Sequence, residues 1–315
     1  MKLRYRILKI VLFSLGILAI LLVFRYGHRD MPLEELKAKY ARESSSFISM
    51  DGMEVHFRDE GAAEDSIPLV LIHGTGSSLH TFDAWTNTLK ATKRVVRMDL
   101  PGFGLTGPFP DRNYSMERYV AFVEGFLSDR GIARCILAGN SLGGQIAWNF
   151  TLEHPGMVEK LILIDAAGYP VKSTSVPMAF RIARTPVLNK LLTFITPRFV
   201  VESSVLNVYA DKSKVTDALV DRYFELSLRD GNRQALIDRM QMPFDTTRLE
   251  QIKSIAQPTL VLWGAQDGLI PVESAYEFHK DLPNDTLVIL EHSGHVPMEE
   301  DPEKSLEVVL PFIAY

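Results

Sequence analysis

The sequence contains a single cysteine, Cys135, among its 315 residues. One cysteine excludes an intrachain disulfide framework and leaves the redox compartment open. Cys135 stands inside an apolar, strand-like run, which predicts a buried and unreactive thiol.

Signatures of metal and cofactor binding are also missing. No cluster of histidine, cysteine and carboxylate residues has metal-ligand spacing, and no Gly-x-Gly-x-x-Gly motif follows a predicted strand. We therefore expect no metal and no nucleotide or other cofactor. Internal repeats and low-complexity tracts are absent as well, and 46% hydrophobic with 23% charged residues is typical of a globular enzyme with a large core.

Charge is absent from residues 10–24, where leucine, isoleucine, valine and phenylalanine dominate. Extended back to residue 7, this run approaches the roughly 20 residues that span a bilayer. Basic residues flank it on both sides: Lys2, Arg4, Arg6, Lys9, Arg25 and Arg29. The pattern predicts an uncleaved transmembrane anchor over residues 1–30. A cleaved signal peptide is the alternative, but no Ala-x-Ala-like site follows Phe24.

The acidic residues all lie beyond this segment. Residues 1–29 hold six basic and no acidic side chains, so the remainder carries 28 basic and 39 acidic residues, a net charge of −11. An acidic body argues against nucleic acid as a partner. We expect the lipid bilayer to be a partner through the N-terminal helix, and a single-pass protein whose main domain lies on the non-cytoplasmic side. The flanking charges leave the orientation open, and the oligomeric state also stays open.

Beyond a polar helix and linker at residues 31–46, strand-like and helix-like segments alternate. A hairpin is expected at residues 47–58 from its central Asp51-Gly52 turn. The following segments are strands at 69–72, 94–98, 135–138, 160–164, 258–263 and 286–290, and helices at 81–90, 115–130 and 145–153. Such alternation predicts an α/β fold, with a mainly parallel sheet and helices on both faces.

This alternation stops at Gly168. Residues 169 to about 244 are helical in pattern and broken by prolines, which predicts a helical cap inserted after a sheet strand. Five parts follow from these patterns. They are the basic flank and anchor (1–30), the linker (31–46), the first part of the core (47–168), the cap (169–248) and the second part of the core (249–315).

The pentapeptide Gly139-Asn140-Ser141-Leu142-Gly143 lies between a predicted strand and a predicted helix. A sharp strand-to-helix turn projects a serine hydroxyl above the sheet edge and requires small neighbours two residues to either side. We therefore predict that Ser141 is a nucleophile.

A serine nucleophile requires a base, and the base requires an acid that orients it. Asp267 follows the predicted strand at 258–263, and His295 follows the one at 286–290. Asp165 is the rival acid, because it also ends a strand, and His292 is the rival base. We favour Asp267 and His295 from their positions in the sequence.

The segment His73-Gly74-Thr75-Gly76 follows a buried strand. Small residues there allow a backbone N–H, that of Thr75, to point at a developing oxyanion together with the N–H of Leu142. His73 is expected to shape this loop and not to transfer protons.

Five motifs together carry a family resemblance: HGTG at 73–76, DLPGFG at 99–104, GNSLGG at 139–144, GAQD at 264–267 and GHVPMEEDPE at 294–303. The chain resembles the α/β-hydrolase superfamily over roughly residues 47–315, and its capped esterases, monoacylglycerol lipases and meta-cleavage-product hydrolases in particular. The resemblance implies the α/β-hydrolase fold and a Ser141–Asp267–His295 triad in the usual chain order.

The leading hypothesis is a cofactor-free serine hydrolase that cleaves a small-molecule carboxylic ester, with lipophilic acyl esters favoured by the anchor and the apolar cap. Hydrolysis of a C–C bond in a vinylogous diketone is the first alternative. It calls for groups that hold a substrate carboxylate, for which Arg181, Arg184, Arg198 and Arg239 are candidates. A non-catalytic binding protein of the same fold is the second alternative.

Overall fold

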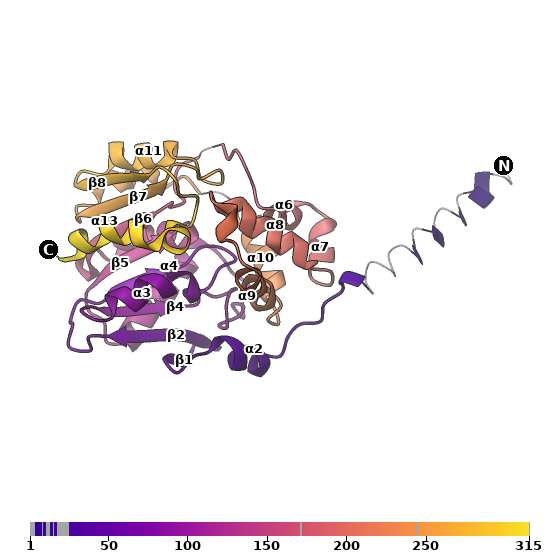
Figure 1. Ribbon diagram of the computed structural model, residues 1–315, viewed down its shortest axis with the longest axis horizontal. Coiled ribbons are helices and arrows are strands. Elements are labelled where there is room, and N and C mark those ends of the chain that lie inside the picture. Colours follow the sequence, from indigo (N-terminus) through magenta and orange to yellow (C-terminus); the bar gives the residue numbers. More distant parts are fainter. Residues whose placement is uncertain are drawn as a thin grey trace.

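The computed structural model describes residues 4–7, 9–10, 13–14, 16–17, 25–170, 172–243 and 245–314, and its centre is an eight-stranded sheet (Figure 1). The strands lie in the order β1-β2-β4-β3-β5-β6-β7-β8. Their bounds are β1 Ser45–Met50, β2 Met53–Gly61, β3 Leu69–Ile72, β4 Arg94–Met98, β5 Cys135–Asn140, β6 Val158–Ile164, β7 Thr259–Gly264 and β8 Asp285–Leu290.

Most of the sheet is parallel, as the sequence predicts. Strand β2 pairs antiparallel with β1 and β4. Along the rest of the sheet, in the order β4-β3-β5-β6-β7-β8, all neighbouring strands are parallel. The predicted hairpin joins β1 to β2, with both turn residues, Asp51 and Gly52, at positive φ (52° and 75°). Two successive positive φ values are the mark of the tight type I′ turn that matches strand twist.

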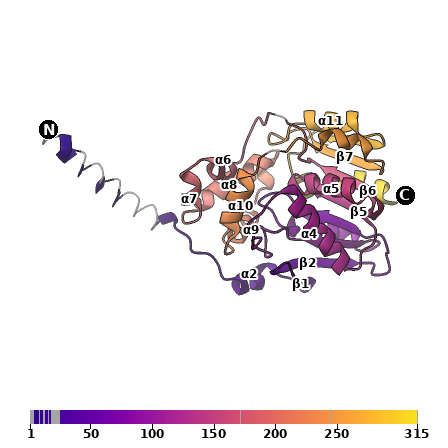
Figure 2. The ribbon, with the colours of Figure 1, turned by 180° about the vertical axis from the view of Figure 1, so that it is seen from behind.

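Helices cover both faces of the sheet, because successive strand side chains point in opposite directions. In β3, Val70 and Ile72 belong to one core cluster, and Leu69 and Leu71 to the other. The first cluster includes α4 (Met116–Asp129), α5 (Leu142–Glu153) and α11 (Glu273–Asp281), which Figure 2 shows from behind. The second includes α12 (Pro297–Glu300) together with α3 (Asp83–Leu89) and α13 (Pro302–Ala314), and the last two lie in front of the sheet in Figure 1.

A group of helices separates β6 from β7 in the sequence and lies to one side of the sheet (Figure 1). These cap helices are α6 Met178–Arg184, α7 Leu188–Leu192, α8 Arg198–Val208, α9 Asp217–Ser227 and α10 Asn232–Gln241. The chain also forms short 3₁₀ helices: η1 Leu79–Phe82, η2 Pro155–Met157, η3 Lys212–Lys214 and η4 Leu249–Ser254. Phe180 of α6 and Met240 of α10 face a cavity that Ser141 and Leu269 also line, so the cap covers the loops at the carboxyl ends of the strands.

The helix after the predicted elbow begins three residues earlier than the sequence pattern suggests. We expected it from Gln145, but α5 starts at Leu142, directly after Ser141. The intervening residues Gly143 and Gly144 are weak helix formers, which hides the start from a propensity argument. Tertiary packing overrides propensity here, because a side chain on either glycine would collide with backbone atoms.

The predicted membrane anchor has to be corrected. Within the described ranges, no helix is long and apolar enough to cross a bilayer. The longest of these helices, α4, has 14 residues, against the roughly 20 that a span requires. The single-pass localisation is therefore contradicted, and the described residues give no support for the bilayer as a partner. Much of the predicted span, at residues 11–12, 15 and 18–24, lies outside the described residues.

The segment that follows the basic flank packs against the cap. Asp30 accepts a hydrogen bond from Arg233 at 2.7 Å, and the Met31 N–H donates to Leu228 at 2.8 Å. The predicted polar helix is α2 (Leu33–Tyr40), whose one buried residue, Leu36, belongs to a small apolar cluster with the cap. These contacts tie the N-terminal part of the described chain to the cap helices.

Candidate active site

Ser141 occupies a strained turn between β5 and α5. Its backbone has φ 54° and ψ −115°, a conformation that costs a non-glycine residue of order 1–3 kcal/mol. Backbone hydrogen bonds over-determine the turn: the Ser141 N–H donates to Ile164 at 3.0 Å, and its carbonyl accepts from Gln145 and Ala167 at 3.0 Å each. These hydrogen bonds hold the strained turn in place, and with it the serine side chain at the edge of the sheet.

Glycine is required on both sides of this turn by close backbone approach. A Cβ on Gly139 would lie 2.2 Å from the backbone carbon of Gly143. A Cβ on Gly143 would lie 2.1 Å from the carbonyl oxygen of Ile72. The spacing seen in the sequence thus has a steric cause, as expected for a nucleophile elbow.

The structure brings Asp267 and His295 into direct contact, with Nδ1 of His295 2.6 Å from Oδ2 of Asp267. A carboxylate can only accept, so Nδ1 carries the proton and Nε2 is left free as a base. The Oδ1 atom of Asp267 accepts from the N–H groups of Leu269 and Ile270 at 2.8 and 3.0 Å, which orients the carboxylate.

The backbone of His295 is bonded to two neighbouring elements. Its carbonyl accepts from the side chain of Asn140 at 2.9 Å, and Asn140 directly precedes Ser141. Its N–H donates to the carbonyl of Val208 at the end of α8. The histidine loop is therefore held beside the serine turn on one side and against the cap on the other.

Asp165, the rival acid, lies next to this pair. Ligand atoms of Asp165, Asp267 and His295 fall within 4.8 Å of one another. Oδ1 of Asp165 accepts from the Gly264 N–H at 2.9 Å, and no donor among the described residues reaches its Oδ2. Burial and the adjacent charge of Asp267 raise the pKa of Asp165 well above its usual range. A neutral Asp165 can donate its own proton towards Asp267.

The predicted oxyanion donors both face the same cavity as Ser141. Leu142 is the first residue of α5, so its N–H has no acceptor within the helix. Thr75 belongs to the loop after β3, and a Cβ on the preceding Gly74 would lie 3.0 Å from Cβ of Ser141. This loop therefore runs close against the serine turn.

His73 acts as the loop-shaping residue that the sequence suggests. Its Nδ1 donates to the Gly74 carbonyl at 2.8 Å, and its Nε2 accepts from the Leu100 N–H at 2.9 Å. Burial lowers the pKa of His73, which keeps the ring neutral and in this tautomer. Both ring nitrogens are occupied by structural hydrogen bonds.

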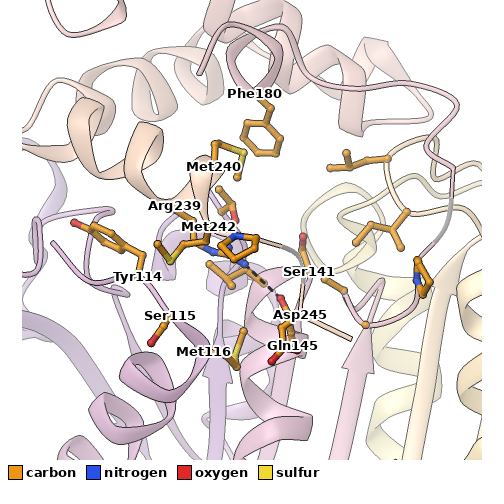
Figure 3. Close-up of a pocket in the computed structure, with 18 of the residues that line it drawn as sticks. Tyr114, Ser115, Met116, Ser141, Gln145, Phe180, Arg239, Met240, Met242 and Asp245 are labelled. Atoms are coloured by element: carbon orange, nitrogen blue, oxygen red, sulfur yellow. Dashed lines mark hydrogen bonds between the residues drawn. The ribbon is translucent and has the colours of Figure 1, made fainter. Parts of the chain in front are cut away.

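A cavity of about 820 Å³ opens over Ser141, between the sheet edge and the cap (Figure 3). Its walls include Tyr114, Met116, Phe180, Met240 and Met242, with Gln145, Arg184 and Arg239 among the polar groups. Of the four arginines that the sequence offered, Arg184 and Arg239 line this cavity, whereas Arg198 is ion-paired with Asp217 and Asp221 on the cap. Arg181 is not among the lining residues.

One residue that shapes the site, Glu300, was not predicted from the sequence. Glu300 is buried, and its two carboxylate oxygens accept from the N–H groups of Gly294 and Asp211 at 2.7 Å each. It thereby joins the loop before His295 to the cap. The GHVPMEEDPE motif contains Glu300, but the motif alone does not show which acid turns inward.

The fold and the site together define a class of protein. Residues 67–302 match the family described as alpha/beta hydrolase fold, and the chain belongs to that family. It is a hydrolase of this fold, as the motifs in the sequence suggest.

Curated relatives share about a quarter of their residues with the chain. An uncharacterized hydrolase, YugF, of Bacillus subtilis is 28% identical over 84% of the chain and 96% of that protein. A 2-hydroxy-6-oxo-6-(2'-aminophenyl)hexa-2,4-dienoic acid hydrolase of Metapseudomonas resinovorans is also 28% identical, over 85% of the chain and 90% of that protein. Among solved structures, a membrane phospholipase A superimposes with a TM-score of 0.71 at 28% identity, covering 98% of each chain.

Proposed function

We propose that the chain is a serine hydrolase that cleaves carboxylic esters, preferably lipophilic acyl esters, through an acyl-enzyme intermediate. The observation that carries this proposal is the direct contact between His295 and Asp267, held beside a strained Ser141 that opens into a large cavity.

In the first half of the reaction, the hydroxyl oxygen of Ser141 attacks the ester carbonyl carbon and its proton passes to Nε2 of His295. Asp267 holds the histidine through Nδ1 and stabilises the imidazolium. The N–H groups of Thr75 and Leu142 bind the oxyanion of the tetrahedral intermediate. His295 then gives the proton to the leaving alcohol, and the acyl group stays on Ser141.

In the second half, water replaces the alcohol. His295 takes a proton from this water, which attacks the acyl carbon, and Ser141 leaves with the proton. The carboxylic acid product then departs. The cap over the cavity restricts access of bulk water to the acyl-enzyme, as lids do in other enzymes.

Support for a lipophilic acyl group comes from a second cavity, of about 120 Å³, under the cap. Its walls are mostly hydrocarbon and come from the core loops and from several cap helices: Phe103, Phe180, Leu192, Val200, Val201, Val205, Leu226 and Leu236. A pocket of this kind binds an alkyl chain by removing apolar surface from water. The likeness to a phospholipase A supports the same substrate class.

A second candidate is hydrolysis of a C–C bond, the activity named for the Metapseudomonas resinovorans relative. The observation in its favour is the pair Arg184 and Arg239 in the cavity, since such substrates carry a carboxylate. The ester proposal is preferred because the hydrocarbon-walled cavity suits an alkyl chain.

Steady-state kinetics on two substrate types separate these candidates. The first type is 4-nitrophenyl esters from acetate to dodecanoate, and the second is a 2-hydroxy-6-oxo-2,4-dienoate. We expect higher kcat/KM for the esters, a rise in kcat/KM with acyl length, and a burst of 4-nitrophenol equal to the enzyme present. Faster cleavage of the dienoate than of every ester would instead establish the C–C activity.

A further inference from the structure

Arg239, on α10 of the cap, faces the cavity over Ser141 and forms no ion pair with any acidic residue that the structure describes (Figure 3). Its Nη2 donates a long hydrogen bond of 3.4 Å to Oε1 of Gln145. Its Nε is buried and has no acceptor among the described residues. A guanidinium group has five N–H donors, so most of its donor capacity is unused.

Several other buried or half-buried arginines form ion pairs, whereas the half-buried Arg229 donates to the carbonyl oxygens of Leu105 and Asp230. Arg97 binds Asp83 and Glu60, and Arg233 binds Asp30. Arg222 binds Glu299 across the interface between cap and core. Removing a guanidinium group from water without a carboxylate partner is costly, and Arg239 is half-buried in the cavity.

The surroundings of Arg239 add positive charge. Burial lowers the pKa of Arg239; the nearby Tyr119 opposes this shift, and the neighbouring Arg184 adds to it by like-charge repulsion. Glu117 and Asp245 line the same cavity, but within the described residues neither forms an ion pair with either arginine. The cavity therefore presents two guanidinium groups that form no ion pair within the described part of the chain, although two carboxylates line it as well.

The apolar cavity under the cap adjoins this charged chamber. Thr75, the predicted oxyanion donor, and Phe180 line both cavities. A substrate held at Ser141 can thus extend in two chemically different directions. Hydrocarbon walls line one cavity, and the guanidinium groups of Arg184 and Arg239 line the other.

We infer that Arg239, with Arg184, forms a subsite for an anionic group of the substrate, which is an amphiphilic ester with an alkyl chain at one end and a carboxylate or phosphate at the other. This inference rests on the proposed ester hydrolysis and specifies its substrate class. Arginine suits the role because its planar fork binds either oxyanion through two parallel hydrogen bonds.

Two matched substrate pairs test the subsite and distinguish the possible anions. The first pair is 4-nitrophenyl valerate and mono(4-nitrophenyl) glutarate, which differ by a carboxylate on the acyl side. The second is a monoacylglycerol and the same lipid with a phosphate on its glycerol, which differ on the alcohol side. For each pair the readout is the ratio of kcat/KM for the anionic ester to that for the neutral ester.

We expect Arg239→Gln to lower this ratio about ten-fold or more in at least one pair, the effect of losing a hydrogen bond to a charged group. The pair that responds shows whether the anion is a carboxylate on the acyl side or a phosphate on the alcohol side. Arg198→Gln is the matched control, because Arg198 is a cap arginine already paired with Asp217 and Asp221. Its ratios should equal those of the wild type.

Ratios in Arg239→Gln that match the wild type in both pairs would overturn the subsite. Because each ratio is internal to one variant, a general loss of folded enzyme does not change it. Failure of the wild type to hydrolyse any of the neutral or anionic esters would instead overturn the proposed function. The two failures are therefore distinguishable.

Discussion

The carboxyl groups of Asp165 and Asp267 lie together in the buried interior, and of the two it is Asp267 that hydrogen-bonds to Nδ1 of His295. Two adjacent carboxyl groups in a medium of low dielectric constant cannot both ionise easily. Here the raised pKa of Asp165 leaves the negative charge on Asp267, where it faces the histidine.

This arrangement predicts opposite outcomes for two similar substitutions. Asp267→Asn should lower kcat by roughly 10⁴-fold, because an amide in this position favours the wrong histidine tautomer. Asp165→Asn should retain most of the activity, because a neutral carboxyl and an amide have the same shape and charge. Ester hydrolysis by the two purified variants, with circular dichroism to check the fold, makes the comparison. A larger loss in Asp165→Asn would assign the acid role to Asp165.

The shifted pKa of Asp165 also predicts a pH dependence of stability. An unfolded aspartate has a pKa of about 3.9. Because the folded pKa is higher, the folded state binds this proton more tightly. The resulting stabilisation is complete below about pH 4 and is lost as pH rises through the folded pKa.

The free energy of unfolding of the wild type relative to Asp165→Asn should therefore fall as pH rises above about 4. Urea denaturation of both proteins at several pH values measures this difference, and pH effects on other groups largely cancel. A difference that stays constant or grows with pH would show that Asp165 is ionised in the folded protein.

Glu300 is predicted to position the histidine loop. Replacing it with glutamine puts an N–H₂ group against the N–H of Gly294 or of Asp211, which breaks one of two buried hydrogen bonds. We expect kcat to fall about 10–100-fold through displacement of His295, with a smaller change in KM. The exposed Glu303→Gln is the control. A kcat equal to that of the wild type in Glu300→Gln would show that Glu300 does not position His295.

Sequence patterns predicted the sheet well because its signals are local. Buried strands such as β3 and β7 are short apolar runs, and the hairpin turn is encoded in two residues, Asp51 and Gly52. The contact between Asp267 and His295 could also be predicted, because both residues follow strands of one parallel sheet and so meet at one edge.

Other features depend on packing between distant segments. That Arg239 forms no ion pair among the residues described cannot be predicted from the sequence, since acids such as Asp238 and Asp245 stand within a few residues of it. The inward orientation of Glu300 depends on where the cap lies. The anchor prediction, drawn from an apolar run and the basic residues on both sides of it, was wrong, because no described helix has the length and apolarity of a span.

The central claim is that Ser141 is the nucleophile, and covalent labelling with a fluorophosphonate tests it most directly. Such a probe reacts with a serine that an adjacent base activates. We predict one adduct per chain by intact mass, located at Ser141 by peptide mapping. In Ser141→Ala, both the adduct and ester hydrolysis should be lost. Labelling or turnover of Ser141→Ala at the wild-type rate would contradict the claim.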